Sequence, residues 1–507
     1  MKYLFRAAVL VLCVMLLSCG GKQDQASAIP TVSVIGTSMG PVPQGLPEVE
    51  SAINAIIEKE IGVRVKLNIF EVGSYMEQVS LMMASQEKAD LVTIFPGGPM
   101  SFSVMVAQNQ LMDIGDLLNQ HGQDLLKATE AIIPGYINAT SIGGKVYGVS
   151  GFYNKVLNEY FLAREDILKK HNISIAELKS LDDIEAVLAK LKAAEPIMSA
   201  ILPATVPGGA LISMDGGCFF EDFAHPILME IFGSVMAPLA VSFSDDPYKV
   251  VNVYKSAEYI KMLERVRRWY QAGYVYKDAA INTEMAEELV KSAKGISWIT
   301  SSETGVEINK TAQTGFPIAT YKITSSPIST GAMTKWGWGV PSYSKEGTAA
   351  VKFLNILYTD ERITNLLTFG IEGRDYVAKP NGTIGYPEGV TSQTVPYHMV
   401  EFLYGNQFLM KVWEGNPPDF RQQILKENKE APVSALMGFL FNPESVQNEL
   451  STITNMLDQY RAPLESGTID FRTGLPEFLK ALDDAGAEKI IAETQKQLDV
   501  WRIANKK

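Results

Sequence analysis

Cysteine and histidine are scarce in this chain of 507 residues, which contains three cysteines and four histidines. Cys13 and Cys19 both lie within the first nineteen residues, so Cys218 has no partner in the rest of the chain. This excludes a disulfide framework and predicts a lone buried thiol at Cys218. The histidines are far apart and show no metal-binding spacing such as H-E-x-x-H, so the sequence predicts neither a metal site nor another cofactor.

Long hydrophobic runs are also lacking. The longest covers residues 7–17, and eleven residues are too few to span a bilayer as a helix. Lys2 and Arg6 precede this run and Leu16-Leu17-Ser18-Cys19 follows, which is typical of a signal peptide over residues 1–18. The ending resembles a bacterial lipobox, which implies lipid attachment to Cys19, a polar tether over residues 19–30 and an extracytoplasmic protein anchored to the cell membrane.

Positive charge is in short supply as well. Without residues 1–18 the chain has 43 basic and 57 acidic residues, a net charge of −14. Such a surface repels nucleic acid and anionic lipid, so we expect no nucleic-acid partner and a membrane contact made only through acyl chains. Hydrophobic residues make up 46% of the chain, which is ample for a folded core.

The segment after the tether alternates strands and helices. Residues 31–36, 63–69 and 91–95 have the pattern of strands, and apolar residues recur at helical spacing between them. This β-α-β-α-β order predicts an α/β fold with a parallel sheet covered by helices. In such sheets ligands bind beyond the carboxyl ends of the strands.

Residues 36–40 read G-x-S-x-G, the pattern of a hydrolase nucleophile elbow. Pro41 and Pro43 follow and favour extended backbone, so a helix cannot begin directly after Ser38 as the elbow requires. We therefore expect Ser38 to contact ligand by hydrogen bonding, with simple turn formation as the alternative. Glu71 and Phe95 end the next two strands and are expected at the same edge.

Aromatic residues follow several other strand patterns. Trp336 and Trp338 stand two apart in KWGWGV, which predicts that both project from one face, with core packing as the alternative. Trp298 and Glu303 lie at and just beyond the end of a predicted strand, and Tyr153 stands where the pattern becomes helix-rich. We expect these residues to contribute to a ligand site.

Several separated segments resemble a known family. The lipobox, IGGKVYGVS at 142–150 and YKSAEYIKMLERVRRWYQAGYVYKDAA at 254–280 are similar to family 1 extracellular solute-binding proteins of bacterial ABC importers. NILYTDERITNLLTFGIEGRDY at 355–376, YGNQFLMKVWEGNPPD at 404–419 and GFLFNPESV at 438–446 resemble a long lipoprotein subgroup with a C-terminal domain of unknown function.

The resemblance implies a type II-like clamshell whose two lobes each hold a mainly parallel sheet flanked by helices, with a helix-rich C-terminal extension. We assign residues 31–153 and 295–340 to lobe 1, and residues 154–294 and 341–507 to lobe 2. The resemblance also implies a ligand site between the lobes. Tyr75 is the better match to an aromatic position near the second strand of the family, and Tyr404 lies in a subgroup-like segment.

The implied function is capture of a solute by a monomeric, non-enzymatic protein that delivers it to a membrane permease. An oligosaccharide is the favoured solute, because sugar rings need aromatic platforms together with fixed hydrogen-bonding groups. Two alternatives stay open on the sequence. One is a surface hydrolase or lyase acting on glycans, and the other is a lipoprotein that senses solute for a receptor.

Overall fold

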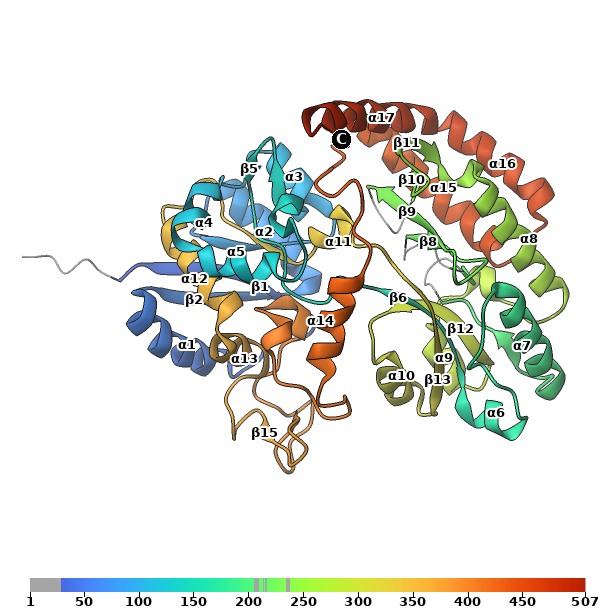
Figure 1. Ribbon diagram of the computed structural model, residues 1–507, viewed down its shortest axis with the longest axis horizontal. Coiled ribbons are helices and arrows are strands. Elements are labelled where there is room, and N and C mark those ends of the chain that lie inside the picture. Colours follow the sequence, from blue (N-terminus) through green and yellow to red (C-terminus); the bar gives the residue numbers. More distant parts are fainter. Residues whose placement is uncertain (1–28, 205–208, 213, 215–216, 234–237, 507) are drawn as a thin grey trace, which may run out of the picture.

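The computed structural model describes residues 29–204, 209–212, 214, 217–233 and 238–506, so the predicted signal peptide and Cys19 lie outside the described residues. Figure 1 shows two lobes side by side, with the N-terminal strands in the left lobe and the C-terminal helices in the right lobe. Among the described residues, no helix is both long enough and apolar enough to cross a bilayer.

The sheet of lobe 1 has the predicted parallel core. It comprises β1 (Thr31–Ser38), β2 (Arg64–Glu71), β3 (Leu91–Ile94) and β14 (Gly337–Gly339), in the order β14-β3-β1-β2. Both β2 and β3 run parallel to β1, and β14 runs antiparallel to β3. The helices α1 (Leu46–Ile61) and α2 (Val72–Ser85) connect the parallel strands, as the alternating pattern predicts.

Local signals explain the bounds of α1. Pro47 occupies its first turn, where a missing N–H is tolerated, and Gly62 ends it in the left-handed conformation with φ of 65°. Asn54 then ties the helix to β2, because its amide donates to the carbonyl of Val65 at 2.9 Å and accepts from the Val65 N–H at 2.7 Å.

Later parts of the chain complete lobe 1. The helices α12 (Gly347–Thr359) and α13 (Glu361–Phe369) pack in the same core as the apolar residues of β1 and β2. Residues 95–157 and 340–430 contain the other α-helices and strands of this part of the chain. These are α3 (Phe102–Ala107), α4 (Gly115–His121), α5 (Gln123–Glu130), β4 (Ser141–Ile142), β5 (Lys145–Val146), β15 (Val377–Ala378), β16 (Ile384–Gly385) and α14 (Phe420–Glu430).

Lobe 2 contains two sheets. The first has the order β13-β6-β12-β7 and the second the order β11-β10-β9-β8. Their strands are β6 (Asn158–Arg164), β7 (Ser199–Ile201), β12 (Gly295–Ser302), β13 (Ile318–Ser325), β8 (Cys218–Phe219), β9 (Ile227–Phe232), β10 (Ala240–Phe243) and β11 (Asp246–Asn252). Cys218 is buried, as predicted.

The sheets of lobe 2 differ from the mainly parallel arrangement that the resemblance implies. Only β12 and β7 pair in parallel, whereas β6 pairs antiparallel with both β12 and β13. The second sheet is antiparallel throughout. The physical reason is that β8 to β11 follow one another through short connections, which join antiparallel neighbours without a crossover helix.

Helices cover lobe 2. They are α6 (Glu165–Lys170), α7 (Leu181–Ala194), α8 (Ala257–Gln271), α9 (Ala286–Lys291), α10 (Val306–Thr314), α15 (Gln447–Glu465), α16 (Phe471–Asp484) and α17 (Ala487–Ala504). Figure 1 shows α15, α16 and α17 arching over α8 and the second sheet. Trp269 of α8 is fully buried in the core that these helices share with the sheets of lobe 2.

The chain passes between the lobes at three places that lie side by side. The N–H of Ser326 donates to the carbonyl of Leu157 at 2.8 Å, and the N–H of Ile328 donates to the carbonyl of Pro432 at 2.8 Å. The N–H of Ser434 returns a bond to the carbonyl of Ile328 at 2.9 Å. These bonds join the segments 154–158, 325–329 and 431–435, which we call the connecting segments.

This path differs from the expected division of the chain. The strands of residues 295–325 pair with β6 in lobe 2, whereas α12 and α13, which follow residue 341, pack in the core of lobe 1. The strand predicted around Trp298 is present as β12, but alternation within a strand carries no information about which sheet the strand joins. Their shared pairing partner, β6, lies more than a hundred residues earlier in the chain.

Candidate functional site

Five aromatic side chains form a continuous row where the carboxyl end of the lobe 1 sheet meets the connecting segments. The ring centroids of Tyr75 and Phe95 are 5.6 Å apart, and those of Phe95 and Trp336 are 4.8 Å apart. Phe402 lies 5.6 Å from Trp336 and 6.0 Å from Tyr153. We call these five residues the aromatic row; the structure thus brings together four residues that the sequence singled out.

One end of the row is held by the sheet. Tyr75 of α2 is fully buried, and its hydroxyl donates to the carbonyl of Thr93 in β3 at 2.8 Å. Its ring stacks on Phe95 with an interplanar angle of 16°, and Phe95 is half-buried. Tyr75 therefore packs in the core against one side of the Phe95 ring, whereas Phe95 is partly exposed to solvent.

Trp336 occupies the centre of the row in an unusual backbone conformation. Its φ is 54°, in the left-handed region that bulky residues rarely adopt. A Cβ at Gly151 would collide with the carbonyl oxygen of Trp336, so glycine is needed for this close approach. Left-handed backbone in a half-buried tryptophan is the kind of strain that concentrates at functional sites.

The structure places only one of the two neighbouring tryptophans in a strand. Trp336 precedes β14 and has a left-handed backbone, so the strand predicted for both residues includes only Trp338. Trp338 is 1% exposed and packs in the core of lobe 1, with its ring 5.8 Å from that of Tyr404. Tyr404 is buried too, and its hydroxyl donates to the carbonyl of Thr37 at 2.7 Å.

Trp298 lies apart from the row. It is 1% exposed and packs in a separate core of lobe 2 with Leu202, Leu289 and other apolar residues. The expectation that it lies near a strand end does not hold, because β12 continues to Ser302 and pairs with β6 along this length. Trp298 therefore stabilises lobe 2 instead of reaching the row.

Ser38 and Glu71 are neighbours at the ends of β1 and β2. Ser38 is 2% exposed, and its hydroxyl donates to the carbonyl of Gly40 at 2.6 Å, which is the turn-forming alternative. The next helix begins only at Leu46, so the geometry of a nucleophile elbow is missing. Glu71 is exposed at this edge.

A lysine lies against the other end of the row. Lys155 is only 4% exposed, and its Nζ lies 3.5 Å from the ring centroid of Tyr153. Burial holds the pKa of Lys155 well below its ordinary value, and the nearby charge of Lys335 acts in the same direction. Among the described residues, no acceptor forms a hydrogen bond with this Nζ.

Lobe 2 contributes an acid to the same place. Glu303 directly follows β12, and burial raises its pKa to about 7. Glu401 adds to this rise and Arg421 opposes it, and both belong to lobe 1, where they form an ion pair at 2.7 Å. Burial also raises the pKa of Tyr153, with Tyr136 and Glu303 adding to the rise. Charged groups of lobe 1 therefore act on Glu303 across the lobe junction.

Sequence reasoning missed four residues of this region: Phe402, Lys155, Glu401 and Arg421. Phe402 lies two residues before Tyr404, and Lys155 two residues after Tyr153, so alternation around the expected positions could have pointed to both. No local signal pointed to Glu401 or Arg421, whose ion pair joins residues twenty apart.

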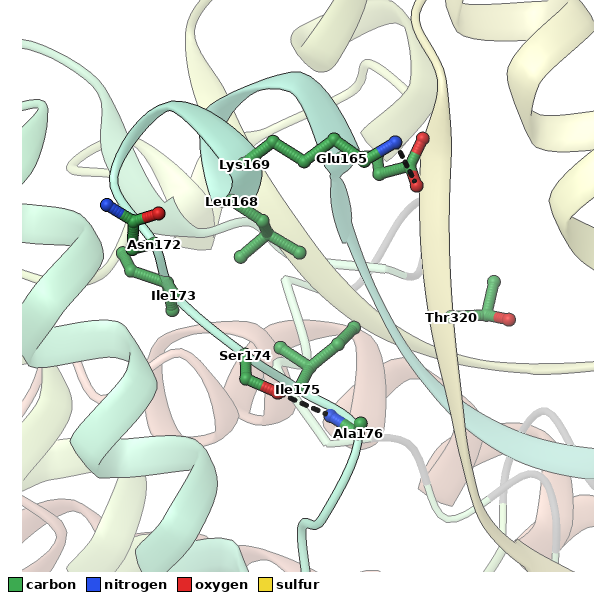
Figure 2. Close-up of a pocket in the computed structure, with 9 residues that line it drawn as sticks. All are labelled: Glu165, Leu168, Lys169, Asn172, Ile173, Ser174, Ile175, Ala176 and Thr320. Atoms are coloured by element: carbon green, nitrogen blue, oxygen red, sulfur yellow. Dashed lines mark hydrogen bonds and ion pairs between the residues drawn. The ribbon is translucent and has the colours of Figure 1, made fainter.

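Two hollows lie away from the aromatic row. A shallow groove of about 570 Å³ lies between α6 and β13, and Figure 2 shows its lining, which includes an ion pair between Glu165 and Lys169 at 2.7 Å but no aromatic ring. A second hollow of about 120 Å³ beside α8 is below the usual range for small-molecule sites. The described residues contain no cluster of His, Cys, Asp or Glu suited to a metal ion.

Comparisons with known proteins agree with this architecture. The chain is 26% identical over its whole length to a carbohydrate ABC transporter substrate-binding protein of Streptococcus pneumoniae, of which 99% is covered. Its fold resembles the N-glycan transport solute binding protein (NgtS) of Streptococcus pneumoniae, with a TM-score of 0.77 and 23% identity over 94% of this chain and 100% of that one. It also resembles an HMO binding ABC-transporter associated solute binding protein from Bifidobacterium longum infantis, with a TM-score of 0.63 and 14% identity over 93% of this chain and 99% of that one.

Family models match two regions. Residues 435–503, which include α15, α16 and all but the last residue of α17, match a domain of unknown function (DUF3502). Residues 45–362 match the family described as bacterial extracellular solute-binding protein, and this region includes every residue of the aromatic row except Phe402. Since that model matches more than half of the chain, this protein belongs to the bacterial extracellular solute-binding proteins.

Proposed function

We propose that this protein is the lipid-anchored solute-binding component of an ABC importer, and that it captures an oligosaccharide at the aromatic row. The observation that carries this proposal is the row itself, with Trp336 and Phe95 half-buried at the carboxyl edge of the lobe 1 sheet. Sugar rings present C–H faces that stack on aromatic platforms and hydroxyls that need polar partners, which Glu303 and Lys155 supply.

The relatives support a sugar ligand. The S. pneumoniae relative that spans the whole chain is a carbohydrate substrate-binding protein. NgtS has been crystallised with Man1GlcNAc and with Man5GlcNAc, and FusA of S. pneumoniae, a further protein of similar fold, with kestose. Neutral oligosaccharides, and those built from mannose and N-acetylglucosamine first among them, are therefore the ligands to test.

The three connecting segments support a mechanism of closure. A ligand that stacks on lobe 1 and bonds to Glu303 of lobe 2 contacts both lobes, so it stabilises the closed population. Closure then presents the loaded protein to the permease. Binding without chemistry suffices for this role, so we propose that the protein is not an enzyme and acts as a monomer.

A binding screen tests the proposal. Purified protein lacking residues 1–18 is heated with Man5GlcNAc, kestose, peptides and amino acids, and hits are titrated by calorimetry. A true ligand at a hundred times its dissociation constant adds about 2.7 kcal/mol to the free energy of unfolding. We expect stabilisation by an oligosaccharide; stabilisation only by peptides or amino acids would contradict the proposal, and release of shorter sugars would favour the hydrolase or lyase.

The anchor is tested separately. Residues 1–28 lie outside the described part, so the proposal for Cys19 rests on Leu16-Leu17-Ser18-Cys19 alone. In cells that express the full chain, Cys19→Ala should abolish incorporation of labelled fatty acid, whereas Cys13→Ala should leave it intact. Normal labelling of Cys19→Ala would contradict lipidation at this residue.

A further inference from the structure

A second group of rings lies in the part of lobe 1 that follows α13. The ring centroid of Trp413 is 4.6 Å from that of His398 and 4.7 Å from that of Tyr386. The Tyr386 hydroxyl and Nδ1 of His398 are 2.9 Å apart and share a hydrogen bond. We call these three residues the second ring cluster. Figure 1 shows β15, which belongs to the same part of the chain, at the lower end of lobe 1.

The second ring cluster covers a small apolar core without being enclosed in it. The core consists of four buried residues, Phe369, Tyr376, Ile384 and Met410. The three rings of the cluster are half-buried. Among the described residues, neither Nε1 of Trp413 nor Nε2 of His398 has a hydrogen-bond partner, and neither atom is fully buried. By contrast, Nε1 of Trp298 is fully buried, so the two tryptophans present their N–H groups differently.

One face of the Trp413 indole carries no other ring of the described chain. The centroid of Phe369 is 5.7 Å from that of Trp413 and 5.6 Å from that of His398. Rings on opposite faces of the indole would be separated by nearly the sum of their distances to it, so Phe369 and His398 pack on the same side. The centroids of Tyr386 and His398 are only 5.8 Å apart, which excludes Tyr386 from the opposite face as well.

Backbone pairing holds Trp413 in place. The N–H of Ile384 donates to the carbonyl of Val412 at 2.8 Å, and the N–H of Glu414 donates to the carbonyl of Ile384 at 2.7 Å. Both neighbours of Trp413 are therefore tied to β16. A platform that is ordered before binding loses little conformational entropy when a ligand stacks on it.

The cluster lies within reach of a ligand held at the aromatic row. His398 and Phe402 belong to the two groups of rings and are four residues apart, so their Cα atoms are separated by at most about 14 Å. The segment after Trp413 also approaches lobe 2, since a Cβ at Gly415 would lie 3.4 Å from Cγ2 of Ile308 in α10. A ligand that extends from the row to the cluster would therefore follow the lobe junction.

The chemistry of the cluster suits a neutral sugar. Burial lowers the pKa of His398, although Glu401 and Asp375 oppose this, so the ring is neutral at about pH 7. With Nδ1 bonded to Tyr386, the neutral ring keeps Nε2 for a hydroxyl group, which can either donate or accept. The indole of Trp413 adds an apolar face for the C–H groups of a sugar and an N–H donor.

We propose that the second ring cluster is a further subsite, at which Trp413 stacks on one ring of an oligosaccharide while another ring of the same chain lies on the aromatic row. This inference rests on the proposed function and adds a preference for chain length. A short sugar contacts the row alone, whereas a longer one contacts both groups of rings. The longer sugar should therefore bind more tightly.

Calorimetric titration with Man1GlcNAc and Man5GlcNAc at about pH 7.5 tests the subsite. Wild type should bind Man5GlcNAc more tightly than Man1GlcNAc. Trp413→Ala should bind Man5GlcNAc about 5 to 150 times more weakly than wild type, which is the usual effect of losing a stacking platform. The same variant should bind Man1GlcNAc as wild type does, whereas Trp336→Ala should weaken the binding of both sugars.

Two conservative variants keep the test independent of folding. His398→Phe retains a ring against Trp413 but removes Nε2, so it should weaken Man5GlcNAc binding about 2 to 10 times and leave Man1GlcNAc binding unchanged. Trp413→Phe retains a smaller platform and should restore part of the affinity that Trp413→Ala loses. Trp501→Ala is the matched control, because it removes a half-buried tryptophan of α17 in lobe 2, and it should bind both sugars as wild type does.

The outcomes separate the subsite from the proposed function. Equal losses of affinity for both sugars in Trp413→Ala and His398→Phe would show that the cluster only supports the fold. Unchanged affinities in both variants, or equal affinity of wild type for the two sugars, would also contradict the subsite. In each of these cases the proposed function stands. If wild type binds neither sugar, both proposals fall.

Discussion

The two lobes bring different chemistry to their junction. Lobe 1 and the adjoining connecting segment contribute rings, with Phe95, Trp336, Phe402 and Tyr153 in contact. Lobe 2 contributes Glu303, while its own tryptophan at the neighbouring strand is buried in the core. Of these two tryptophans, only Trp336, which precedes its strand in a left-handed conformation, is half-buried and lies in the aromatic row, so a position near a strand does not by itself decide whether a tryptophan is core.

The largest effect is expected in the core of lobe 2. Trp298→Ala replaces a buried indole by a cavity and should lower the free energy of unfolding by about 3 to 5 kcal/mol. Denaturation in urea measures this loss, and the folded protein should bind sugar with native affinity. Trp298→Phe should cost less, because the indole N–H has no hydrogen-bond partner among the described residues. A Trp298→Ala variant that unfolds like wild type would contradict the role of Trp298 as a stabilising core residue of lobe 2.

The second prediction concerns affinity at the row. Trp336→Ala should weaken sugar binding by about 1 to 3 kcal/mol, by analogy with other stacking platforms, and should change the melting temperature little because the ring is half-buried. Calorimetry and thermal melting of the same sample measure both quantities. Trp338→Ala is the matched control two residues away and should show the reverse, with early melting. Native sugar affinity in the Trp336→Ala variant would show that the sugar does not stack on the Trp336 ring.

The third prediction sharpens the difference in backbone between these two tryptophans. Glycine adopts the left-handed conformation of residue 336 without strain, whereas alanine does not. Trp336→Gly should therefore have a free energy of unfolding about 1 kcal/mol higher than Trp336→Ala. At position 338 the order should be reversed, since glycine weakens a strand. Equal stabilities at position 336 would argue against strain there.

The smallest effect is a pH dependence in lobe 2. Burial raises the pKa of Glu230 to about 7, with a hydrogen bond to Ser434 opposing the rise. A folded-state pKa above the unfolded value stabilises the protein fully at low pH, and this contribution is lost as pH rises through about 7. Glu230→Gln should therefore be more stable than wild type at about pH 8 and similar at about pH 4. Equal stability of Glu230→Gln and wild type at about pH 8 would contradict the raised pKa of Glu230.

Much of the fold follows from periodicity over a few residues. Alternation in residues 63–69 and helical spacing in α1 and α8 are enough to predict these elements, because each buries one face against whatever neighbour it has. The parallel sheet of lobe 1 also follows, since strands joined by helices run parallel. The mostly antiparallel sheets of lobe 2 cannot be predicted from local periodicity, because β6 pairs with strands far along the chain.

The candidate site divides in the same way. Local pattern was enough to make Phe95, Tyr153, Trp336 and Glu303 candidates, since they lie at or beyond strand patterns or at a change of pattern, and the family resemblance added Tyr75. Three features needed the folded chain: Trp298 and Trp338 are core, Phe402 joins the row, and Lys155 is buried away from solvent. The physical reason is that residue type and spacing are local, whereas burial and electrostatic surroundings are sums over segments hundreds of residues apart.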